Sequence, residues 1–342
     1  MDLIGRTTEG GWLVGEQITF SDDHTGGNFS VCYSVTRSQE KAFLKALDIE
    51  KFDPNILSMV LSGFQHETKL VNHCRDKQLT RVIQVLESGQ LDQQNNLPPI
   101  LRFVPFLIFE LAHKGDIRSS LSIGDRNVTD EWRFRILHQT SLALLQLHNL
   151  NIAHQDVKPS NVLRFEKDTL KLGDLGRSSM KGLSSPHDEL PIPGALNYAP
   201  FEQRYGYLAP DWIERRQSGD VFHLGCLLVF SFTNICFPEF VMQKVASAYK
   251  PEFWGNHYSE ALPFLLESAI KAVNELSIDF PDQYRNDLVT IILDLCHPDP
   301  ALRGRSGLIK KSQPLLVSLH RYASIFDRLG KRARINMRRD NV

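Results

Sequence analysis

The chain has 342 residues, of which 42% are hydrophobic, so it is long enough for one large domain of two lobes or for two smaller domains. Its 39 Lys and Arg residues nearly balance its 40 Asp and Glu residues, which argues against a global field that attracts nucleic acid or an anionic membrane. Five scattered cysteines without a CxxC pair argue against a disulfide framework and against a thiolate zinc site. We therefore expect a cytoplasmic, reducing location.

The N-terminus and the most apolar run argue against export and against a membrane span. The first residues lack the basic start and the continuous apolar stretch of a signal peptide. The most apolar run, residues 221–240, is interrupted by His223, Asn234 and Pro238 among other polar positions. It falls short of the roughly 20 apolar residues that a spanning helix needs. We interpret it as a buried core helix.

The first third of the chain predicts an antiparallel sheet with one helix. Short apolar runs alternate with turn residues, which is typical of strands. The expected strands cover residues 17–20, 30–35, 42–47, 81–86 and 103–109. Asp53 and Pro54 suit the N-cap and first turn of a helix that continues to about Cys74, and Gly63 is a point where this helix could divide.

Beyond residue 111 the pattern becomes helical. Thr129 suits an N-cap, and Asp130 and Glu131 suit the positive end of the helix that follows. Further helices are expected at about residues 220–232, 258–276, 284–296 and 313–329. The final stretch, residues 321–342, has seven Lys and Arg against two Asp and predicts a basic, frayed tail.

Two short motifs between the sheet and these later helices carry the chemistry. Residues 154–161 read His-Gln-Asp-Val-Lys-Pro-Ser-Asn, and residues 172–176 read Leu-Gly-Asp-Leu-Gly. They place two carboxylates, an ammonium group and a carboxamide within about 20 residues, a set suited to moving a phosphoryl group from Mg-ATP to a hydroxyl. Each residue alone would be interpreted as a turn former or a helix cap, but the combination in this register is not expected by chance.

These motifs resemble the catalytic loop and the metal-binding loop of the protein kinase family, with Gln155 where many members have Arg and Leu175 where most have Phe. The resemblance implies an α+β fold of two lobes, with a small antiparallel-sheet N-lobe that contains one main helix and a mostly helical C-lobe. We expect the N-lobe at residues 1–111, the C-lobe at 112–320 and the basic tail at 321–342.

The resemblance also implies a role for each polar residue of the motifs. Asp156 would accept the proton of the attacking hydroxyl, and Lys158 would reach the γ-phosphate of ATP. Asn161 and Asp174 would hold Mg²⁺, with Mn²⁺ as an alternative, because hard cations prefer oxygen ligands. Lysine at position 158 is typical of members that act on Ser and Thr. The implied reaction is the transfer of the γ-phosphate of ATP to a Ser or Thr hydroxyl of a protein substrate.

Landmarks outside the motifs support the resemblance. Lys45, in Ala-Phe-Leu-Lys, resembles the phosphate-binding lysine, and Glu67 is the only Glu between residues 51 and 86 and hence its candidate partner. Residues 194–202 resemble the end of an activation segment, with Pro-Phe-Glu instead of Ala-Pro-Glu. Glu202 is expected to pair with Arg303, and Asp220 to hold the backbone of the catalytic loop.

The nucleotide pocket matches the family less closely. Residues 25–32 lie where the Gly-rich loop belongs, and Gly26 and Gly27 are its candidate glycines, although a Gly-Gly pair alone usually marks a turn. Cys32 takes the place of a valine that packs on adenine, and Phe43 stands where a small Ala usually lines the pocket.

The resemblance assigns the rest of the adenine site to the segment that follows the last predicted strand and to a residue just after the catalytic-loop motif. The backbone of Glu110 and Ala112 would bind adenine, and Leu163 would form the floor of its site.

Regulation can be argued from Gln155. In kinases with Arg at that place, the guanidinium commonly pairs with a phosphorylated residue of the activation loop, and Gln has no charge for this. The loop still contains four serines that are candidates for autophosphorylation: Ser178, Ser179, Ser184 and Ser185.

The sequence leaves two other functions open. A pseudokinase, which signals by conformation, is favoured by the irregular Gly-rich loop and by Phe43, whereas retention of Lys45, Asp156, Asn161 and Asp174 favours activity. A small-molecule phosphotransferase would share the catalytic Asp and the metal ligands but generally lacks the long segment that ends at Glu202.

The basic tail could recruit nucleic acid or an acidic partner, or it could be a helical extension packed on the C-lobe, which we favour.

Overall fold

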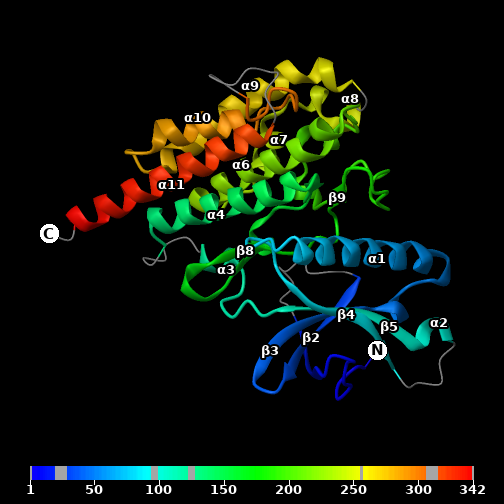
Figure 1. Cartoon of the computed structure of the whole chain (residues 1–342). Helices are drawn as coiled ribbons and strands as arrows, with labels where there is room; N and C mark the ends of the chain where they lie inside the picture. The colour runs from blue at the N-terminus through cyan, green and yellow to red at the C-terminus, as the bar shows by residue number, and fades with distance from the viewer. Residues whose placement is uncertain are drawn as a thin grey trace.

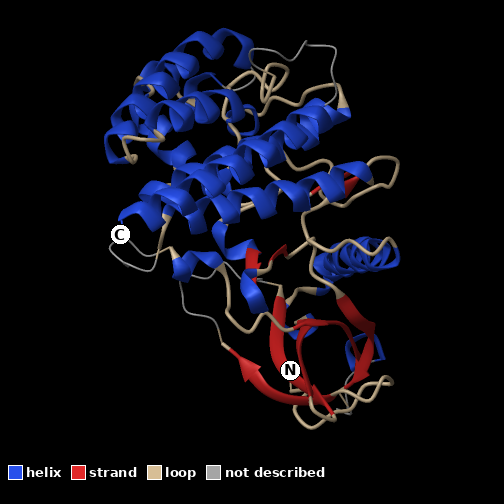
Figure 2. Ribbon diagram, turned by 60° about the vertical axis from the view of Figure 1, so that its left-hand side comes forward, coloured by secondary structure: helices blue, strands red, loops and turns tan. Residues whose placement is uncertain are grey.

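The computed structural model describes residues 2–19, 29–93, 99–121, 128–254, 257–305 and 315–340. Gly26 and Gly27 lie outside these residues. The chain forms two lobes, with the main sheet and helix α1 (Pro54–Asp76) in one and most of the other helices in the second (Figure 1). Figure 2 shows the same division, with the long strands at one end of the molecule and the long helices of the second lobe at the other. The predicted α+β architecture of two lobes is confirmed, while the exact lobe boundaries stay predictions.

The N-lobe sheet is antiparallel, and its strands follow the spatial order β1-β2-β3-β5-β4. The strands are β1 (Leu13–Ile18), β2 (Ser30–Arg37), β3 (Glu40–Leu47), β4 (Val85–Asp92) and β5 (Phe103–Glu110). In β3, Ala42, Leu44 and Ala46 are buried, which leaves Phe43 and Lys45 on the opposite face because side chains alternate along a strand.

The fourth strand starts later than expected. It was predicted at residues 81–86, but β4 begins at Val85. The backbone of residues 81–83 is instead bonded to Leu172 of the C-lobe: Ile83 N–H donates to the Leu172 carbonyl at 2.9 Å, and Leu172 N–H donates to the Arg81 carbonyl at 2.8 Å. These residues therefore connect the lobes.

Helix α1 is continuous. Asp53 caps it as expected, with its Oδ1 accepting from Asn55 N–H at 2.8 Å. Gly63 does not divide the helix. A side chain at Gly63 would come within 3.9 Å of His187, so this glycine lies where the C-lobe approaches the helix.

The C-lobe is built around helices α4 (Asp130–Asn149), α6 (Ser218–Thr233), α9 (Tyr258–Leu276) and α10 (Arg285–Leu295). Thr129 caps α4 through a bond from Trp132 N–H to its Oγ1 at 3.1 Å. The shorter elements include β6 (Ile152–Ala153), β7 (Val162–Arg164), β8 (Leu170–Leu172), β9 (Ser179–Met180), α2 (Pro99–Arg102), α3 (Ile117–Ser120), α5 (Phe201–Arg204) and α8 (Pro251–Trp254).

The apolar run at residues 221–240 is not one core helix. It is divided between α6 and α7 (Phe237–Lys244), which meet at 91°. Asn234 ends α6 in the left-handed conformation with φ 56°, and Pro238 lies in the first turn of α7, where proline is tolerated. Among the described residues no single helix is long and apolar enough to cross a membrane; only the bent pair of residues 213–233 and 237–244 reaches that length and composition together.

The last described residues form a long helix, α11 (Leu315–Asp340), that packs along α4 (Figure 1). The expectation of a frayed tail is wrong for residues 321–340, and the alternative of a packed helical extension fits. The reason is an apolar stripe with helical spacing, whose buried members are Leu319, Tyr322, Phe326, Leu329 and Ala333.

Candidate active site

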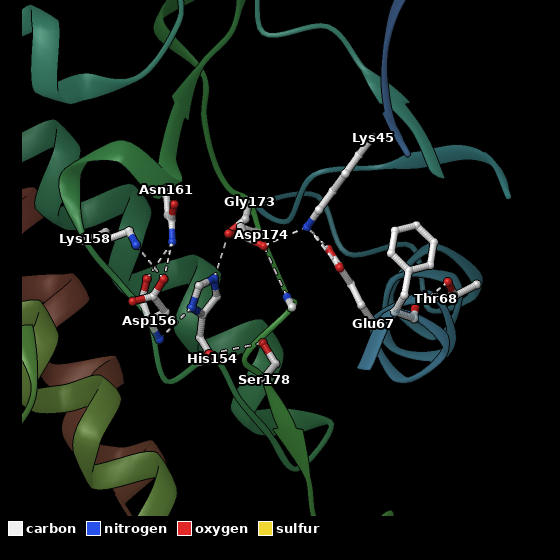
Figure 3. Close-up of polar contacts among 12 residues, drawn as sticks. Lys45, Glu67, Thr68, His154, Asp156, Lys158, Asn161, Gly173, Asp174 and Ser178 are labelled. Carbon is white, nitrogen blue, oxygen red and sulfur yellow. Dashed lines mark hydrogen bonds and ion pairs between the residues drawn. The ribbon is translucent and has the colours of Figure 1, made fainter. Parts of the chain in front are cut away.

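Three charged side chains meet where the lobes face each other (Figure 3). Lys45 Nζ on β3 lies 2.7 and 3.0 Å from the two carboxylate oxygens of Glu67 on α1, and 3.2 Å from Asp174 Oδ1. Burial alone would lower the pKa of Lys45, but the carboxylates of Asp174 and Glu67 outweigh it and raise the pKa above its usual value. The Lys45 ammonium in turn holds the pKa of Asp174 well below its usual range. Burial raises the pKa of Glu67, although the Lys45 ammonium opposes this rise. The charged form is therefore favoured most clearly for Lys45 and Asp174.

The catalytic-loop residues form a second group around Asp156. Its Oδ2 accepts from Lys158 Nζ at 2.8 Å and from Asn161 Nδ2 at 3.2 Å, and its Oδ1 accepts from the backbone N–H of Ala195 at 2.8 Å. Asn161 Nδ2 also donates to the Asp156 carbonyl at 2.8 Å. The orientation of the Asp156 carboxylate is thus fixed by three donors from two segments.

One buried carboxylate binds the backbone of the catalytic loop. Asp220 on α6 accepts from the backbone N–H groups of His154 at 2.8 Å and Gln155 at 2.7 Å, and contacts His148 Nε2 at 2.8 Å. Burial alone would raise the pKa of Asp220, but the hydrogen bond from His148 and the neighbouring histidines lower it below its ordinary value. The expected role of Asp220 as a tether of the catalytic-loop backbone is confirmed.

His154 joins the two motifs of the sequence. Its Nε2 lies 2.9 Å from the carbonyl of Gly173, the residue before Asp174 (Figure 3). The catalytic loop and the metal-binding loop are therefore fixed relative to each other through one imidazole ring.

The activation segment, residues 174–202, approaches the catalytic loop closely at Gly194. A Cβ atom at this position would lie 2.3 Å from the Gln155 carbonyl and 3.0 Å from Asp156 Oδ1, so only glycine fits. The contact between Ala195 N–H and Asp156 depends on this approach, and the role of Ala195 was not predicted. The spacing between Gly194 and Glu202, which matches the family, was the sequence feature that could have indicated this contact.

The far end of the activation segment is fixed by the expected ion pair. The guanidinium of Arg303 donates to both carboxylate oxygens of Glu202, each at 2.8 Å, and both side chains are buried. This prediction is confirmed.

A cavity of about 500 Å³ lies between the lobes. Lys45, Glu67, Asp156, Lys158 and Asp174 line it, so the structure brings these five predicted residues to one site. The lining of the cavity also includes Met59 and Phe64 of α1, Arg118 of α3, and Leu196 and Tyr198 of the activation segment. The cavity therefore extends well beyond the five predicted residues.

The predicted adenine site does not line this cavity in the described part of the chain. Cys32 lies on β2 opposite Lys45 on β3, and burial raises the pKa of its thiol to about 11. The Glu110 carboxylate binds Lys171 Nζ at 2.6 Å, and the Ala112 carbonyl accepts from Gly115 N–H at 3.0 Å. Leu163, on β7, packs against Gly173, where a Cβ atom would come within 2.8 Å of Leu163 Cδ1.

The four serines of the activation segment differ in exposure. Ser178, Ser179 and Ser185 are buried, and Ser184 is exposed. Only Ser184 of the four is accessible for modification in this conformation.

Comparison with known proteins identifies the family of this fold. A model of the protein kinase domain matches residues 25–311, and the chain therefore belongs to the protein kinase family. The serine/threonine-protein kinase nekl-2 of Caenorhabditis elegans is 27% identical over 80% of the chain and 74% of its own length.

Two further relatives match shorter stretches. The mitosis inhibitor protein kinase mik1 of Schizosaccharomyces pombe is 34% identical over 39% of the chain and 22% of its own length. The serine/threonine-protein kinase PLK4 of Drosophila sechellia is 27% identical over 56% of the chain and 23% of its own length. The matched part of the chain thus spans less than a quarter of these two relatives.

Proposed function

We propose that the chain is an active protein kinase that transfers the γ-phosphate of ATP to Ser or Thr hydroxyls of proteins. The observation that carries this proposal is the formed ion pair between Lys45 and Glu67, with Asp174 3.2 Å from the same ammonium group. A phosphate-binding lysine held by two carboxylates from different elements is costly to explain by stability alone, because each buried charge must be desolvated.

The residues present fit a divalent cation. The side chain of Asp174 is 39% exposed, and it lines the cavity between the lobes. Asn161 uses its Nδ2 to bind Asp156, which leaves its amide oxygen as a ligand. Oxygen ligands from one carboxylate and one amide suit Mg²⁺, which keeps several waters and binds nucleotide phosphates. Bound there, Mg²⁺ would neutralise charge on the phosphates.

Asp156 and Lys158 then have separate tasks. Asp156 would accept the hydrogen bond of the attacking hydroxyl and take its proton, since its carboxylate lines the cavity and is oriented by Ala195 N–H. Lys158 Nζ, 2.8 Å from Asp156 Oδ2, would contact the transferred phosphoryl group and stabilise its charge.

The activation segment favours a protein acceptor over a small metabolite. It runs for residues 174–202 and is anchored at both ends, by Asp174 near Lys45 and by the pair Glu202–Arg303. A long anchored segment beside the catalytic carboxylate provides a surface on which an extended peptide can bind. The Ser/Thr-directed kinases among the relatives are consistent with this substrate class.

The test is transfer of label from γ-labelled ATP in the presence of Mg²⁺, with the Asp174→Ala variant as control. We expect label on the chain itself or on generic basic proteins, and none above background with the variant. Small hydroxylated metabolites in the same assay separate a protein kinase from a small-molecule phosphotransferase. If wild type transfers no more label than Asp174→Ala, the chain is a binding module and the proposal fails.

A further inference from the structure

Arg216 is a buried cation at the junction between the catalytic loop and the activation segment. Its side chain is only 3% exposed. Its Nη1 donates to Gln155 Oε1 at 2.7 Å, and its Nη2 donates to the carbonyl of Asp188 at 2.9 Å and to Asp188 Oδ1 at 3.2 Å. Gln155 completes the connection through Nε2, which donates to the Arg177 carbonyl at 2.7 Å. One guanidinium therefore links three segments of the chain.

An irregular helical turn places Arg216 there. Ile213–Gln217 forms a π-helix directly before α6, and such wide turns often occur at functional sites because they redirect side chains. The neighbouring Arg215 also donates through Nη2 to the Asp188 carbonyl. The π-helix thus directs two guanidinium groups toward one residue of the activation segment.

Asp188 organises the activation segment around this contact. Its Oδ2 accepts from Ser185 N–H at 2.9 Å, and its Oδ1 accepts from Ser179 Oγ at 3.2 Å. Two separate parts of the segment, β9 and the turn at Ser185, are bound to the carboxylate that pairs with Arg216. Breaking the pair would release both.

The anchor lies close to the catalytic carboxylate along the chain. Between Asp188 and Ala195, the segment contains Pro191 and Pro193, which restrict the backbone. Ala195 N–H is the donor that orients Asp156. A fixed Asp188 and a stiff connection therefore favour a fixed Ala195.

A buried guanidinium requires a negative partner, since an unpaired buried charge is strongly destabilising. Burial lowers the pKa of Arg216 to about 10, so the side chain remains charged at neutral pH. Asp188 supplies the negative charge from within the chain. In addition, Ser178, Ser179 and Ser185 are buried beside this network and are not accessible for phosphorylation.

We propose that Arg216 is a positioning residue that holds the activation segment in its substrate-binding form through Gln155 and Asp188, so that protein substrates bind without phosphorylation of the segment. The substrate part of this inference rests on the proposed kinase function. The anchoring part concerns the order of residues 181–193 and does not depend on activity.

The first experiment compares phosphatase-treated wild type with Arg216→Gln and Asp188→Asn, and with the controls Ser184→Ala and Arg328→Gln, which change exposed side chains. We measure kcat and KM for a protein substrate and for ATP. For Arg216→Gln and Asp188→Asn we expect KM for the protein substrate to rise about tenfold or more while KM for ATP changes by less than about twofold. Wild type and both controls should remain active after phosphatase treatment.

The second measurement is hydrogen exchange and limited proteolysis of residues 181–193, which reports anchoring whether or not the chain transfers phosphate. Cleavage should become about tenfold faster in Arg216→Gln and Asp188→Asn and stay unchanged in Arg328→Gln. Arg216→Lys, which keeps the charge but loses the forked geometry, should lie between wild type and Arg216→Gln.

A relocated charge provides the sharpest test. Gln155→Arg alone puts a second guanidinium beside Arg216 and should loosen the segment by repulsion. The double variant Gln155→Arg/Arg216→Gln restores a single guanidinium facing Asp188 and should recover most of the protection and the substrate affinity.

Two results would overturn the inference: unchanged protection and unchanged substrate KM in Arg216→Gln, or a wild type that becomes active only after phosphorylation. Wild type could transfer no phosphate while residues 181–193 still lose their protection in Arg216→Gln. In that case the anchoring role of Arg216 stands and only the proposed kinase function fails.

Discussion

The guanidinium of Arg303 and the carboxylate of Glu202 form a two-point ion pair across 101 positions of the chain, with side-chain exposures of 0% and 3%. Arg303 Nη1 also donates to Ser218 Oγ at 3.2 Å and Nη2 to the Pro298 carbonyl at 3.1 Å. The pair therefore fixes the end of the activation segment to the start of α6 and to the loop that follows α10.

Removal of one partner of this pair should destabilise the C-lobe strongly. Arg303→Ala leaves the Glu202 carboxylate buried and uncompensated, and we expect a loss of about 3–5 kcal/mol in the free energy of unfolding. Urea denaturation measures it. The matched control is Lys271→Ala, which breaks an exposed pair with Glu267 and should cost less than about 1 kcal/mol. Similar losses in the two variants would contradict the buried character of the Glu202–Arg303 pair.

The pair between Lys45 and Glu67 should affect catalysis more than stability. Glu67→Gln removes the negative charge on α1 that pairs with Lys45. Asp174 is then the remaining carboxylate beside the Lys45 ammonium group. Because a displacement of about 1 Å can cost about 10²-fold in rate, we expect kcat to fall by about 10–100-fold. Steady-state kinetics against ATP and a protein substrate measure it. The control is Glu40→Gln, which changes an exposed carboxylate on the same strand as Lys45. Equal activity of Glu67→Gln and wild type would show that the ion pair between Lys45 and Glu67 is not needed for catalysis.

The sequence predicted those parts of the site that short motifs specify. His154, Asp156, Asn161 and Asp174 lie within one loop and the strand pair that follows it, so their spacing already fixes their neighbourhood. The distant pairs Lys45–Glu67 and Glu202–Arg303 could be predicted because the resemblance supplied their partners.

Features that depend on packing between distant elements were not predictable. The role of Arg216 was missed because nothing near residues 213–217 marks a π-helix, and because its partners lie 61 and 28 positions away. The division into α6 and α7 was predicted in part: a helix was expected at about residues 220–232, but the whole run 221–240 was interpreted as one core helix although Asn234 and Pro238 interrupt it. For α11, a helical extension packed on the C-lobe was the favoured alternative, but the sequence did not indicate that it packs along α4.

Phe43 gives a test of the nucleotide site. Its ring shares the face of β3 with Lys45 and lies opposite Ser34 on β2 and Phe109 on β5. A small side chain there would leave more room for adenine, so we expect Phe43→Ala to bind Mg-ATP several-fold more tightly in calorimetry. Phe103→Ala, which removes an exposed ring at the start of β5, is the control. Weaker binding by Phe43→Ala would instead indicate that the ring contacts the nucleotide.

His187 should make the stability of the chain depend on pH. Burial and the positive charge of Arg177 lower the pKa of His187 from 6.5 to about 4. Between these two values the unfolded chain binds a proton that the folded chain does not, so the folded state loses stability as the pH falls from 6.5 toward 4, and below that range the loss is complete.

Substitution of His187 isolates this contribution. Allowing for its partial exposure, we expect the free energy of unfolding of wild type relative to His187→Gln to decrease by about 1–3 kcal/mol between pH 7 and pH 4.5. Denaturant titrations of both proteins across this range measure it, with His113→Gln, a change of an exposed imidazole, as the matched control. Parallel pH profiles of wild type and His187→Gln would mean that the imidazole is solvated, and that the contact of the activation segment with α1 at Gly63 is looser than the structure indicates.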